Sequence, residues 1–273
     1  MTSSLVQYRV DEHGIATLTL DDPVRMNPLT MPLFEQCLDA LDRVRADRSV
    51  HALVLAAHGR GFCSGADLRA LDQSLSGERA ADAPTPGEDI ARLMEEGGNR
   101  LILALRELPV PVVCAMHGAA AGGGVGVVLA CDVIVAARSA YFYLPFAPAL
   151  GLVPDMGATW FLSRTAGDAR TSGLTLLGDR LTAEQAERWG VIWSCVDDAA
   201  LPIEVQKTAQ RLAALPAGAI AEQRALMAHA RTASLAEQLD YERLRQRKLI
   251  DEPDFAEGVR AFVQRRAPRF SRR

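Results

Sequence analysis

The sequence lacks the residue spacings that mark a zinc site or a disulfide framework. None of its five cysteines forms a CxxC pair, and none of its five histidines lies in an HxxxH or HExxH motif. Widely spaced cysteines in odd number are typical of reduced thiols. We therefore expect a cytoplasmic protein without a metal site.

The sequence also shows no pattern typical of a targeting segment. The first residues do not combine a basic stretch with an apolar one, so no secretory signal is expected. The most apolar stretch, residues 110–137, contains Pro111, His117 and Asp132 as well as a run of glycines. A strand, a turn, a helix and a second strand explain this pattern better than a membrane span, so we expect no membrane partner.

The chain has no excess of charge of one sign. Thirty basic and thirty-four acidic side chains give a formal net charge of −4, so we expect no nucleic-acid partner. The arginine-rich segment at residues 260–273 could bind phosphate or could be a solvated surface. With 273 residues, of which 49% are apolar, the chain can form one large domain or a core with an appendage.

The order of hydrophobic patterns predicts an α/β fold. Short apolar runs predict strands, and apolar positions three or four residues apart predict helices. The expected strands lie at 15–20, 52–57, 112–117, 132–137 and 141–144, and the expected helices at 31–46, 89–106 and 124–131. Because nearly everything after residue 200 is expected to be helical, we predict an α/β core with a helical C-terminal part.

Two kinds of local signal refine this outline. Residues 72–90 are polar and contain two prolines and two glycines, which favours a mobile loop or lid. Thr182 with Gln185, and Ser234 with Glu237, match the capping-box pattern and predict that helices begin there.

A glycine-rich stretch, GAAAGGGVG at residues 118–126, follows one of the predicted strands. Each glycine inside a helix costs about 1 kcal/mol relative to alanine, so three adjacent glycines need a reason. The stretch is either a tight turn into a helix or a place where the backbone approaches a ligand and presents its amides. It does not match the dinucleotide-binding template, and it lacks the lysine of a P-loop.

Two further segments could carry chemistry. Residues 59–68 (GRGFCSGADL) are rich in small residues but contain no GxSxG elbow. Cys63 is predicted to be a buried thiol rather than a nucleophile, because no histidine is close to it in sequence. Asp155 is the only acid between Asp132 and Asp168, which suits either a helix N-cap or a group placed for proton transfer.

Together these stretches resemble the crotonase family, the enoyl-CoA hydratases and isomerases. The resemblance covers nearly the whole chain and rests on RMNP at 25–28, GFCSGADL at 61–68, VCAMHGAAAGGGVGVVLACD at 113–132, GLVPD at 151–155 and LTAEQAERWGV at 181–191. Within the family the chain is most similar to the ring-epoxide (1,2-epoxyphenylacetyl-CoA) isomerases of bacterial phenylacetate breakdown. That similarity lies in GLVPDMGATWFL, LTAEQAERWGVIW and DFAEGVRAFVQRRAPRF.

The resemblance implies a fold, an assembly and a substrate class. The fold would be a crotonase-like spiral of ββα repeats over residues 1–200, which holds the acyl-CoA site, followed by a helical trimerisation region at 201–273. The chain would form a homotrimer or a homohexamer. Its substrate would be an acyl-CoA thioester, and it would need no cofactor besides that coenzyme A.

The resemblance also implies site residues. Its oxyanion hole of two backbone amides falls, by motif, on Ala66 and Gly123, and both lie in small-residue segments expected to open helices, where free amides favour negative charge. Asp155 matches the acid of the family's isomerases and would act as general base and acid, with a pKa raised by burial. The expected substrate-binding residues are Arg25, Ser64, Asp67, Leu68 and Gly122, with the Arg25 side chain and the 64–68 backbone holding the CoA.

The chain departs from the family's hydratases, which activate water with two glutamates. The first belongs where this chain has Gly126 and the second near residues 146–148, yet no acid occurs from 133 to 154. We therefore expect an isomerase that moves a double bond or opens a ring epoxide. The alternatives are a 2-enoyl-CoA hydratase with another acid, a non-catalytic acyl-CoA-binding protein and, last, an RNA-binding member. Four aromatic residues could line an acyl pocket or belong to the core: Phe142, Tyr143, Phe146 and Trp160.

Overall fold

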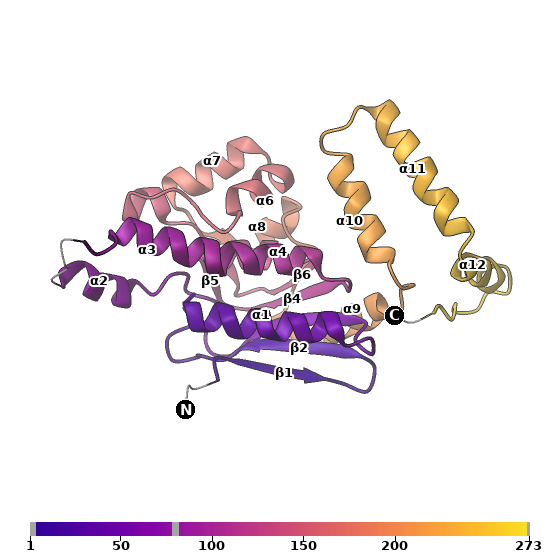
Figure 1. Cartoon of the computed structure of the whole chain (residues 1–273), viewed down its shortest axis with the longest axis horizontal. Coiled ribbons are helices and arrows are strands. Elements are labelled where there is room, and N and C mark those ends of the chain that lie inside the picture. Colours follow the sequence, from indigo (N-terminus) through magenta and orange to yellow (C-terminus); the bar gives the residue numbers. More distant parts are fainter. Residues whose placement is uncertain (1–3, 78–81, 272–273) are drawn as a thin grey trace.

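The structure, a computed structural model, describes residues 4–77 and 82–271. Its main sheet has six strands in the order β1-β2-β3-β4-β6-β9 (Figure 1). These strands are β1 (Val6–Val10), β2 (Ile15–Leu20), β3 (Ala52–Ala57), β4 (Val112–Met116), β6 (Val133–Ala137) and β9 (Ser194–Val196). β1 pairs antiparallel with β2, and all other neighbours are parallel. Long crossover segments must therefore connect the parallel strands.

A second, smaller sheet has the order β5-β7-β8. Its strands are β5 (Ala119–Ala121), β7 (Tyr141–Tyr143) and β8 (Leu181–Thr182). β4 and β5 are followed by helix α5 (Gly123–Leu129), and β6 and β7 are followed by helix α6 (Ala158–Thr165) after a π-helical turn, η2 (Phe146–Leu150). Each of these units places one strand in each sheet and then a helix, which is the expected ββα repeat.

The remaining helices cover the sheets and form the C-terminal part. They are α1 (Met31–Ala46), α2 (Leu68–Ser76), α3 (Pro86–Leu93), the π-helical turn η1 (Met94–Gly98), α4 (Asn99–Glu107), α7 (Asp168–Leu177), α8 (Ala183–Arg188), the 3-10 turn η3 (Asp198–Ala200), α9 (Leu201–Ala213), α10 (Ala219–His229), α11 (Leu235–Ile250) and α12 (Pro253–Val263).

Both faces of the main sheet are covered by helices. α1 and α4 pack on one face, where Leu53 and Leu55 of β3 join the large hydrophobic core. α9 packs on the opposite face, where Val54 of β3 belongs to a smaller cluster with Leu201 and Val205. Adjacent residues of β3 enter different clusters because side chains alternate between the two faces of a strand.

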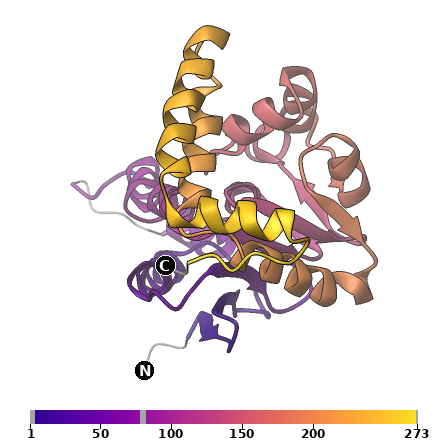
Figure 2. The ribbon, with the colours of Figure 1, turned by 90° about the vertical axis from the view of Figure 1, so that its right-hand side faces the viewer.

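Helices α10, α11 and α12 form an arm that stands apart from the sheets (Figure 1), and α12 crosses the front of the core when seen from the arm side (Figure 2). Arg224 of α10 joins the arm to the core, because its Nε donates to Asp132 Oδ1 at 2.8 Å and its Nη1 to the carbonyl of Leu108. The helical C-terminal part is thus confirmed. The domain boundary at residue 200 stays a prediction, and α9 just beyond it packs on the main sheet.

The prediction of a mobile loop at residues 72–90 is wrong for much of that segment. α2 occupies its first part, because the Asp67 side chain caps that helix. α3 occupies its last part, because Thr85 and Glu88 form a capping box and a proline fits the first helical position. Residues 78–81 lie outside the described part of the chain, so the structure does not test the prediction there.

Other predicted elements are present with shifted limits. The helix predicted at 89–106 is one continuous helical segment, α3–η1–α4, that begins at Pro86 and ends at Glu107. The apolar stretch at 110–137 forms β4, α5 and β6, as predicted, and also the short strand β5, which was not predicted. Within residues 4–77 and 82–271, every helix is too short or too polar to cross a membrane.

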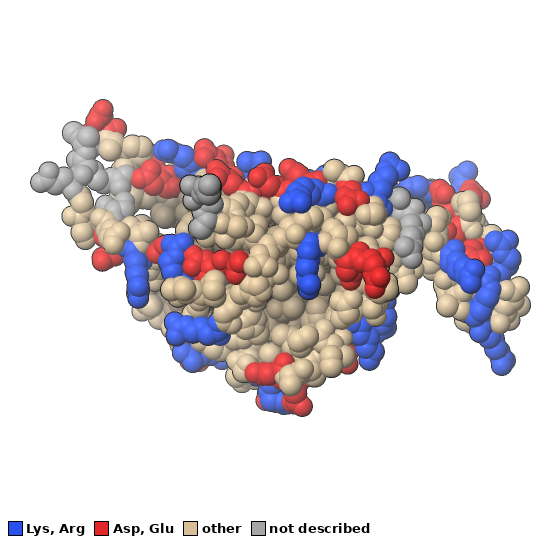
Figure 3. Space-filling model, turned by 90° about the horizontal axis from the view of Figure 1, so that it is seen from below, with Lys and Arg blue, Asp and Glu red and all other residues tan. Residues whose placement is uncertain are grey.

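Acidic and basic side chains are mixed over the face in Figure 3, and basic ones gather at the arm. Two arginines of the C-terminal segment pair within the chain, since Arg266 Nη1 lies 2.6 Å from Glu257 Oε1 and Arg260 Nε lies 3.8 Å from Oε2. Hydrogen bonds from Arg266 lower the pKa of the Glu257 carboxyl to about 2. Phosphate binding by this segment stays a prediction.

Candidate active site

Asn27 organises the loop that carries one predicted oxyanion residue. Its side chain is buried, and its Nδ2 donates to the carbonyl oxygens of His58 and Phe62, both at 3.0 Å. Its Oδ1 accepts from the backbone amide of Asp22 at 2.7 Å. A buried amide with this many partners fixes the path of the backbone around it. Sequence reasoning did not assign Asn27 a role, and its only signal was its place in the segment RMNP.

The two glycine-rich segments of the sequence lie against each other. Cys63 donates its amide to the carbonyl of Ala119 at 3.0 Å, and Ala121 donates to the carbonyl of Cys63 at 2.9 Å. Gly65 has a φ of +83°. A Cβ at this position would lie 2.8 Å from the carbonyl oxygen of Ala121, so only glycine permits this approach. The small residues thus allow two backbones of the chain to approach each other, and the predicted approach of a ligand to these segments stays a prediction.

This pairing brings the Ala66 and Gly123 segments to one place. Ala66 is exposed and Gly123 is buried. Within the described residues, neither backbone amide has a hydrogen-bond partner, so both can donate to a ligand. Gly123 opens α5, as expected. Ala66 does not open a helix, because Asp67 is the N-cap of α2 and the helix begins only at Leu68.

Asp155 lies directly beside Gly123. A Cβ built on Gly123 would be 3.0 Å from Asp155 Oδ1. The carboxyl sits at the start of a tight turn, in which Ala158 donates its amide to the carbonyl of Asp155 at 3.0 Å. Met156 in this turn has a φ of +50°, a conformation that costs a residue with a side chain roughly 1–2 kcal/mol.

The helix-cap interpretation of Asp155 is wrong. The N-cap of α6 is Gly157, and no side chain of residues 4–77 or 82–271 caps that helix. Asp155 Oδ1 is buried without a hydrogen-bond partner among the described residues. Burial raises the pKa of the Asp155 carboxyl to about 6, because removal from water disfavours the charged form. The alternative, a group placed for proton transfer, fits an acid with these properties.

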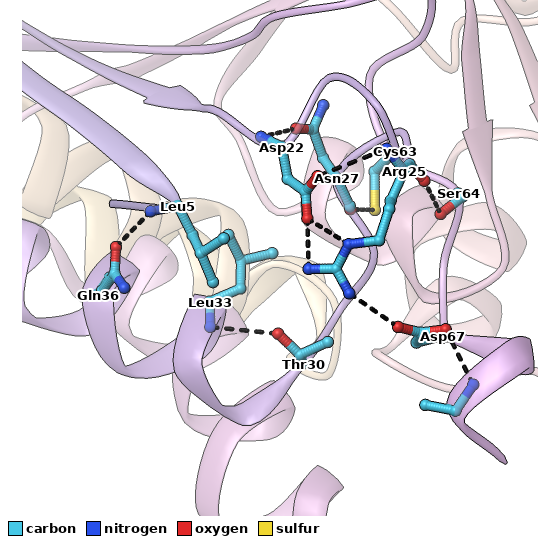
Figure 4. A network of polar contacts seen from close by, with 11 residues as sticks. Leu5, Asp22, Arg25, Asn27, Thr30, Leu33, Gln36, Cys63, Ser64 and Asp67 are labelled. Carbon is cyan, nitrogen blue, oxygen red and sulfur yellow. Dashed lines mark hydrogen bonds and ion pairs between the residues drawn. The ribbon is translucent and has the colours of Figure 1, made fainter. Parts of the chain in front are cut away.

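Most of the predicted substrate-binding residues form one polar cluster (Figure 4). Arg25 Nε donates to Asp22 Oδ2 at 2.7 Å, and Arg25 Nη1 lies 3.1 Å from Asp67 Oδ2. Ser64 Oγ donates to the carbonyl of Arg25 at 3.4 Å, and Leu68 is half exposed at the start of α2. The structure thus places these residues together, and their contact with CoA stays a prediction.

Gly122, the remaining predicted substrate-binding residue, lies next to this cluster with a φ of +53°. A Cβ on it would be 3.6 Å from Gly65 Cα and 3.8 Å from Phe146 Cζ. Phe146 therefore lies at the site. Phe142 is buried in the large core, and Trp160 is half exposed, with the Arg164 guanidinium 4.2 Å from its ring centre.

Cys63 carries no reactive thiolate. It is fully buried, and its Sγ donates to the carbonyl of Asn27 at 3.1 Å. Burial raises the pKa of the Cys63 thiol to about 12, so the group is protonated at neutral pH. The prediction of a buried thiol is confirmed.

Comparison with known proteins agrees with this geometry. The enoyl-CoA hydratase/isomerase family profile matches residues 11–273. The chain is 41% identical over 260 residues to 1,2-epoxyphenylacetyl-CoA isomerase of Escherichia coli K12. The alignment covers 95% of this chain and 96% of the Escherichia coli protein. The chain is 37% identical over 273 residues to a probable enoyl-CoA hydratase of Rhodobacter capsulatus, covering 100% of both chains.

Solved structures share the architecture as well. An enoyl-CoA hydratase/isomerase structure from Mycobacterium abscessus superimposes with a TM-score of 0.87 at 32% identity, covering 98% of this chain and 100% of that one. The predicted crotonase-like α/β fold and the resemblance to the epoxide isomerases are both confirmed. The chain therefore belongs to the enoyl-CoA hydratase/isomerase family.

Proposed function

We propose that this protein is an acyl-CoA isomerase in which Asp155 moves a proton between two carbons of a thioester substrate. The observation that carries the proposal is the Asp155 carboxyl, which is partly buried and lies beside Gly123, and whose Oδ1 has no hydrogen-bond partner in the part of the chain that the structure describes. An acid in that environment is suited to exchange a proton with a bound substrate. The similarity to an epoxyphenylacetyl-CoA isomerase supports this assignment.

The proposed reaction begins when the Asp155 carboxylate removes a proton next to the thioester carbonyl. The electron pair moves into the carbonyl and gives an enolate, whose oxygen accepts from the amides of Ala66 and Gly123. One preorganised donor of this kind contributes roughly 3–4 kcal/mol to the barrier reduction. The protonated Asp155 then returns the proton to another carbon, which moves the double bond; in a ring epoxide, the same enolate would assist opening of the ring.

A pKa of about 6 suits both half-reactions. At neutral pH most of the Asp155 population is ionised and can act as the base. After the first step the Asp155 carboxyl is protonated. Because its pKa is close to neutral pH, it can also give this proton up again to the second carbon. The reaction needs no cofactor besides the CoA of the substrate, and the cytoplasmic location expected from the reduced thiols stays a prediction.

The environment of Gly126 argues against water addition. A Cβ on Gly126 would lie 2.6 Å from Met156 Cβ and 2.8 Å from the Met156 carbonyl carbon. The main chain next to Asp155 thus fills the space that a hydratase glutamate at position 126 would need. The turn η2, near the place of the second glutamate, contains only apolar residues (FAPAL).

A substrate panel in deuterated water tests the proposal. We expect 3-enoyl-CoA, 2-enoyl-CoA or ring-epoxide phenylacetyl-CoA to be isomerised with uptake of deuterium, followed by mass spectrometry. Hydration of crotonyl-CoA at a comparable rate would assign the chain to the hydratases. Tight binding of the thioesters without deuterium uptake would make it a non-catalytic acyl-CoA-binding protein.

We further propose that the arm of α10–α12 assembles three copies of the chain, alone or as a dimer of trimers. Support comes from apolar side chains that the single chain leaves exposed, among them Leu235 (75%), Phe262 (87%) and Val263 (75%). The double variant Phe262→Asp/Val263→Asp is expected to sediment as a monomer, whereas the parent should sediment as a trimer or a hexamer. Ile203→Asp on α9, where the side chain is also exposed (69%), is the control and should leave the assembly intact. A monomeric parent would contradict the proposal.

A further inference from the structure

Met156, the residue after the proposed base, adopts a backbone conformation that its side chain disfavours. Its φ is +50°, and that of Gly157 is +74°. With the hydrogen bond from the Ala158 amide to the Asp155 carbonyl, these angles describe a tight turn that normally takes asparagine or glycine at both central positions. Since methionine has no such preference, its surroundings must hold the turn.

The Met156 side chain is 4% exposed and sits in a socket made by three glycines, Gly98, Gly123 and Gly126. A Cβ on Gly98 would overlap Met156 Sδ and lie 3.3 Å from Cε, and one on Gly123 would lie 2.8 Å from Cγ. A Cβ on Gly126 would overlap the Met156 carbonyl oxygen. None of these glycines has a positive φ, so close approach explains their identity better than backbone conformation.

One wall of the socket is the π-helical turn η1. η1 interrupts the helix between α3 and α4 and ends in Gly97 and Gly98, both buried. The two glycines face different nearest partners: a Cβ on Gly97 would overlap Phe34 Cδ2, whereas one on Gly98 would overlap Met156 Sδ and reach Phe34 only at Cζ, 3.4 Å away. Insertions of this kind inside helices are frequent at functional sites.

We propose that Met156 is a positioning residue: its side chain, held between η1 and α5, locks the turn that places the Asp155 carboxyl beside Gly123. The inference rests on the proposed function of Asp155. It follows from the space that both residues share beside Gly123, since a Cβ built there would lie 2.8 Å from Met156 Cγ and 3.0 Å from Asp155 Oδ1. A change in how far the Met156 side chain reaches between Gly98 and Gly123 therefore moves the Asp155 carboxyl relative to the Gly123 amide.

The test compares Met156→Ala, Met156→Gly and Met156→Leu with the parent. Both small residues are expected to lower kcat by about tenfold to a hundredfold, because small displacements of a catalytic group have effects of this size. KM should change less than about twofold, since uniform binding is untouched. Met156→Leu, which refills the socket, should recover most of the rate. Met156→Gly also removes the backbone strain, so it keeps the test valid if Met156→Ala does not fold.

The pH profile separates positioning from mere stability. In Met156→Gly, greater hydration of the Asp155 carboxyl is expected to move the acidic limb of kcat below pH 6, towards the ordinary aspartate range. Gly98→Ala should have the same effects, because its methyl group displaces Met156. Gly97→Ala, which pushes on Phe34 in the same turn, is the matched control and should keep the parent kcat and pH profile at a temperature where it is folded.

The outcomes distinguish the two claims. If Asp155→Asn is inactive but Met156→Gly and Met156→Ala keep the parent kcat and acidic limb, the positioning role is refuted and the proposed function stands. If Asp155→Asn keeps the parent activity, the proposed function fails and the positioning role fails with it. If Gly97→Ala and Gly98→Ala reduce kcat equally, the effect is a general one of the helix and the positioning role is also refuted.

Discussion

Asp155→Asn is expected to lower kcat for isomerisation by about 10²–10⁴-fold, the range that a general acid–base group contributes. Asparagine keeps the shape of the side chain beside Gly123, but it can neither accept nor return the proton. Binding of the thioester should change little, because the amides of Ala66 and Gly123 remain. The measurement is the rate of deuterium uptake into a bound acyl-CoA together with KM for isomerisation.

The same variant supplies its own control for folding. Burial raises the pKa of Asp155 in the folded protein from 3.8 to about 6, so the unfolded chain ionises at lower pH than the folded one. The free energy of unfolding therefore falls as pH rises from about 4 to 6, by up to about 3 kcal/mol, since each pKa unit corresponds to about 1.4 kcal/mol. Asparagine does not ionise, so the Asp155→Asn variant does not lose stability in this way. Urea denaturation at pH 4.5 and at pH 7.5 should show that the free energy of unfolding of Asp155→Asn, relative to the parent, is higher at pH 7.5.

An equal stability difference at both pH values would contradict the burial of the Asp155 carboxyl that raises its pKa. An isomerisation rate near that of the parent would remove Asp155 from the mechanism. A variant that is more stable than the parent at neutral pH and yet inactive would show that the buried Asp155 carboxyl lowers the stability of the fold while it serves catalysis.

Gly126→Glu is expected to abolish isomerisation without creating a hydratase. The added side chain must displace the Met156 main chain, which carries Asp155, so the proposed base moves as well. Even Gly126→Ala should destabilise the fold by about 2 kcal/mol, because overpacking costs more than the gain in helix propensity. The measurements are urea denaturation, isomerisation and loss of crotonyl-CoA absorbance.

Gly173→Ala in α7 is the matched control, because a Cβ there has no atom within 4 Å among the described residues. It should be neutral or more stable by up to about 1 kcal/mol, as expected for alanine in a helix. A folded Gly126→Glu variant that hydrates crotonyl-CoA would overturn the steric argument and favour the hydratase alternative.

The sequence was sufficient for the regular elements of the core. The expected limits of β2, β3 and α1 match the structure, because each has a clear apolar pattern between turn or cap signals. β1, β5, β8 and β9 were not predicted. β1 is a half-exposed edge strand without a strong pattern, and the other three have only two or three residues, too few for a periodicity to show.

The site was predictable only in part, because its construction depends on contacts between distant segments. The convergence of the Ala66 and Gly123 segments was expected only from the family resemblance, although their small residues are what allows the close approach of 63–66 to 119–122. The roles of Asn27 and Met156 did not follow from the sequence pattern, since each depends on partners about 30 or more residues away. The η1 turn was equally hidden, because its glycines are explained by Phe34 and Met156 rather than by a local pattern.

The most direct test of the central claim is a crystal structure of the protein with an unreactive acyl-CoA analogue that keeps a carbonyl oxygen. We expect this oxygen to lie about 2.7–3.1 Å from the amide nitrogens of both Ala66 and Gly123, the range of oxyanion-hole donors. The α-carbon should then face the Asp155 carboxyl. An oxygen bound elsewhere, or an Asp155 side chain turned away from the ligand, would contradict the account.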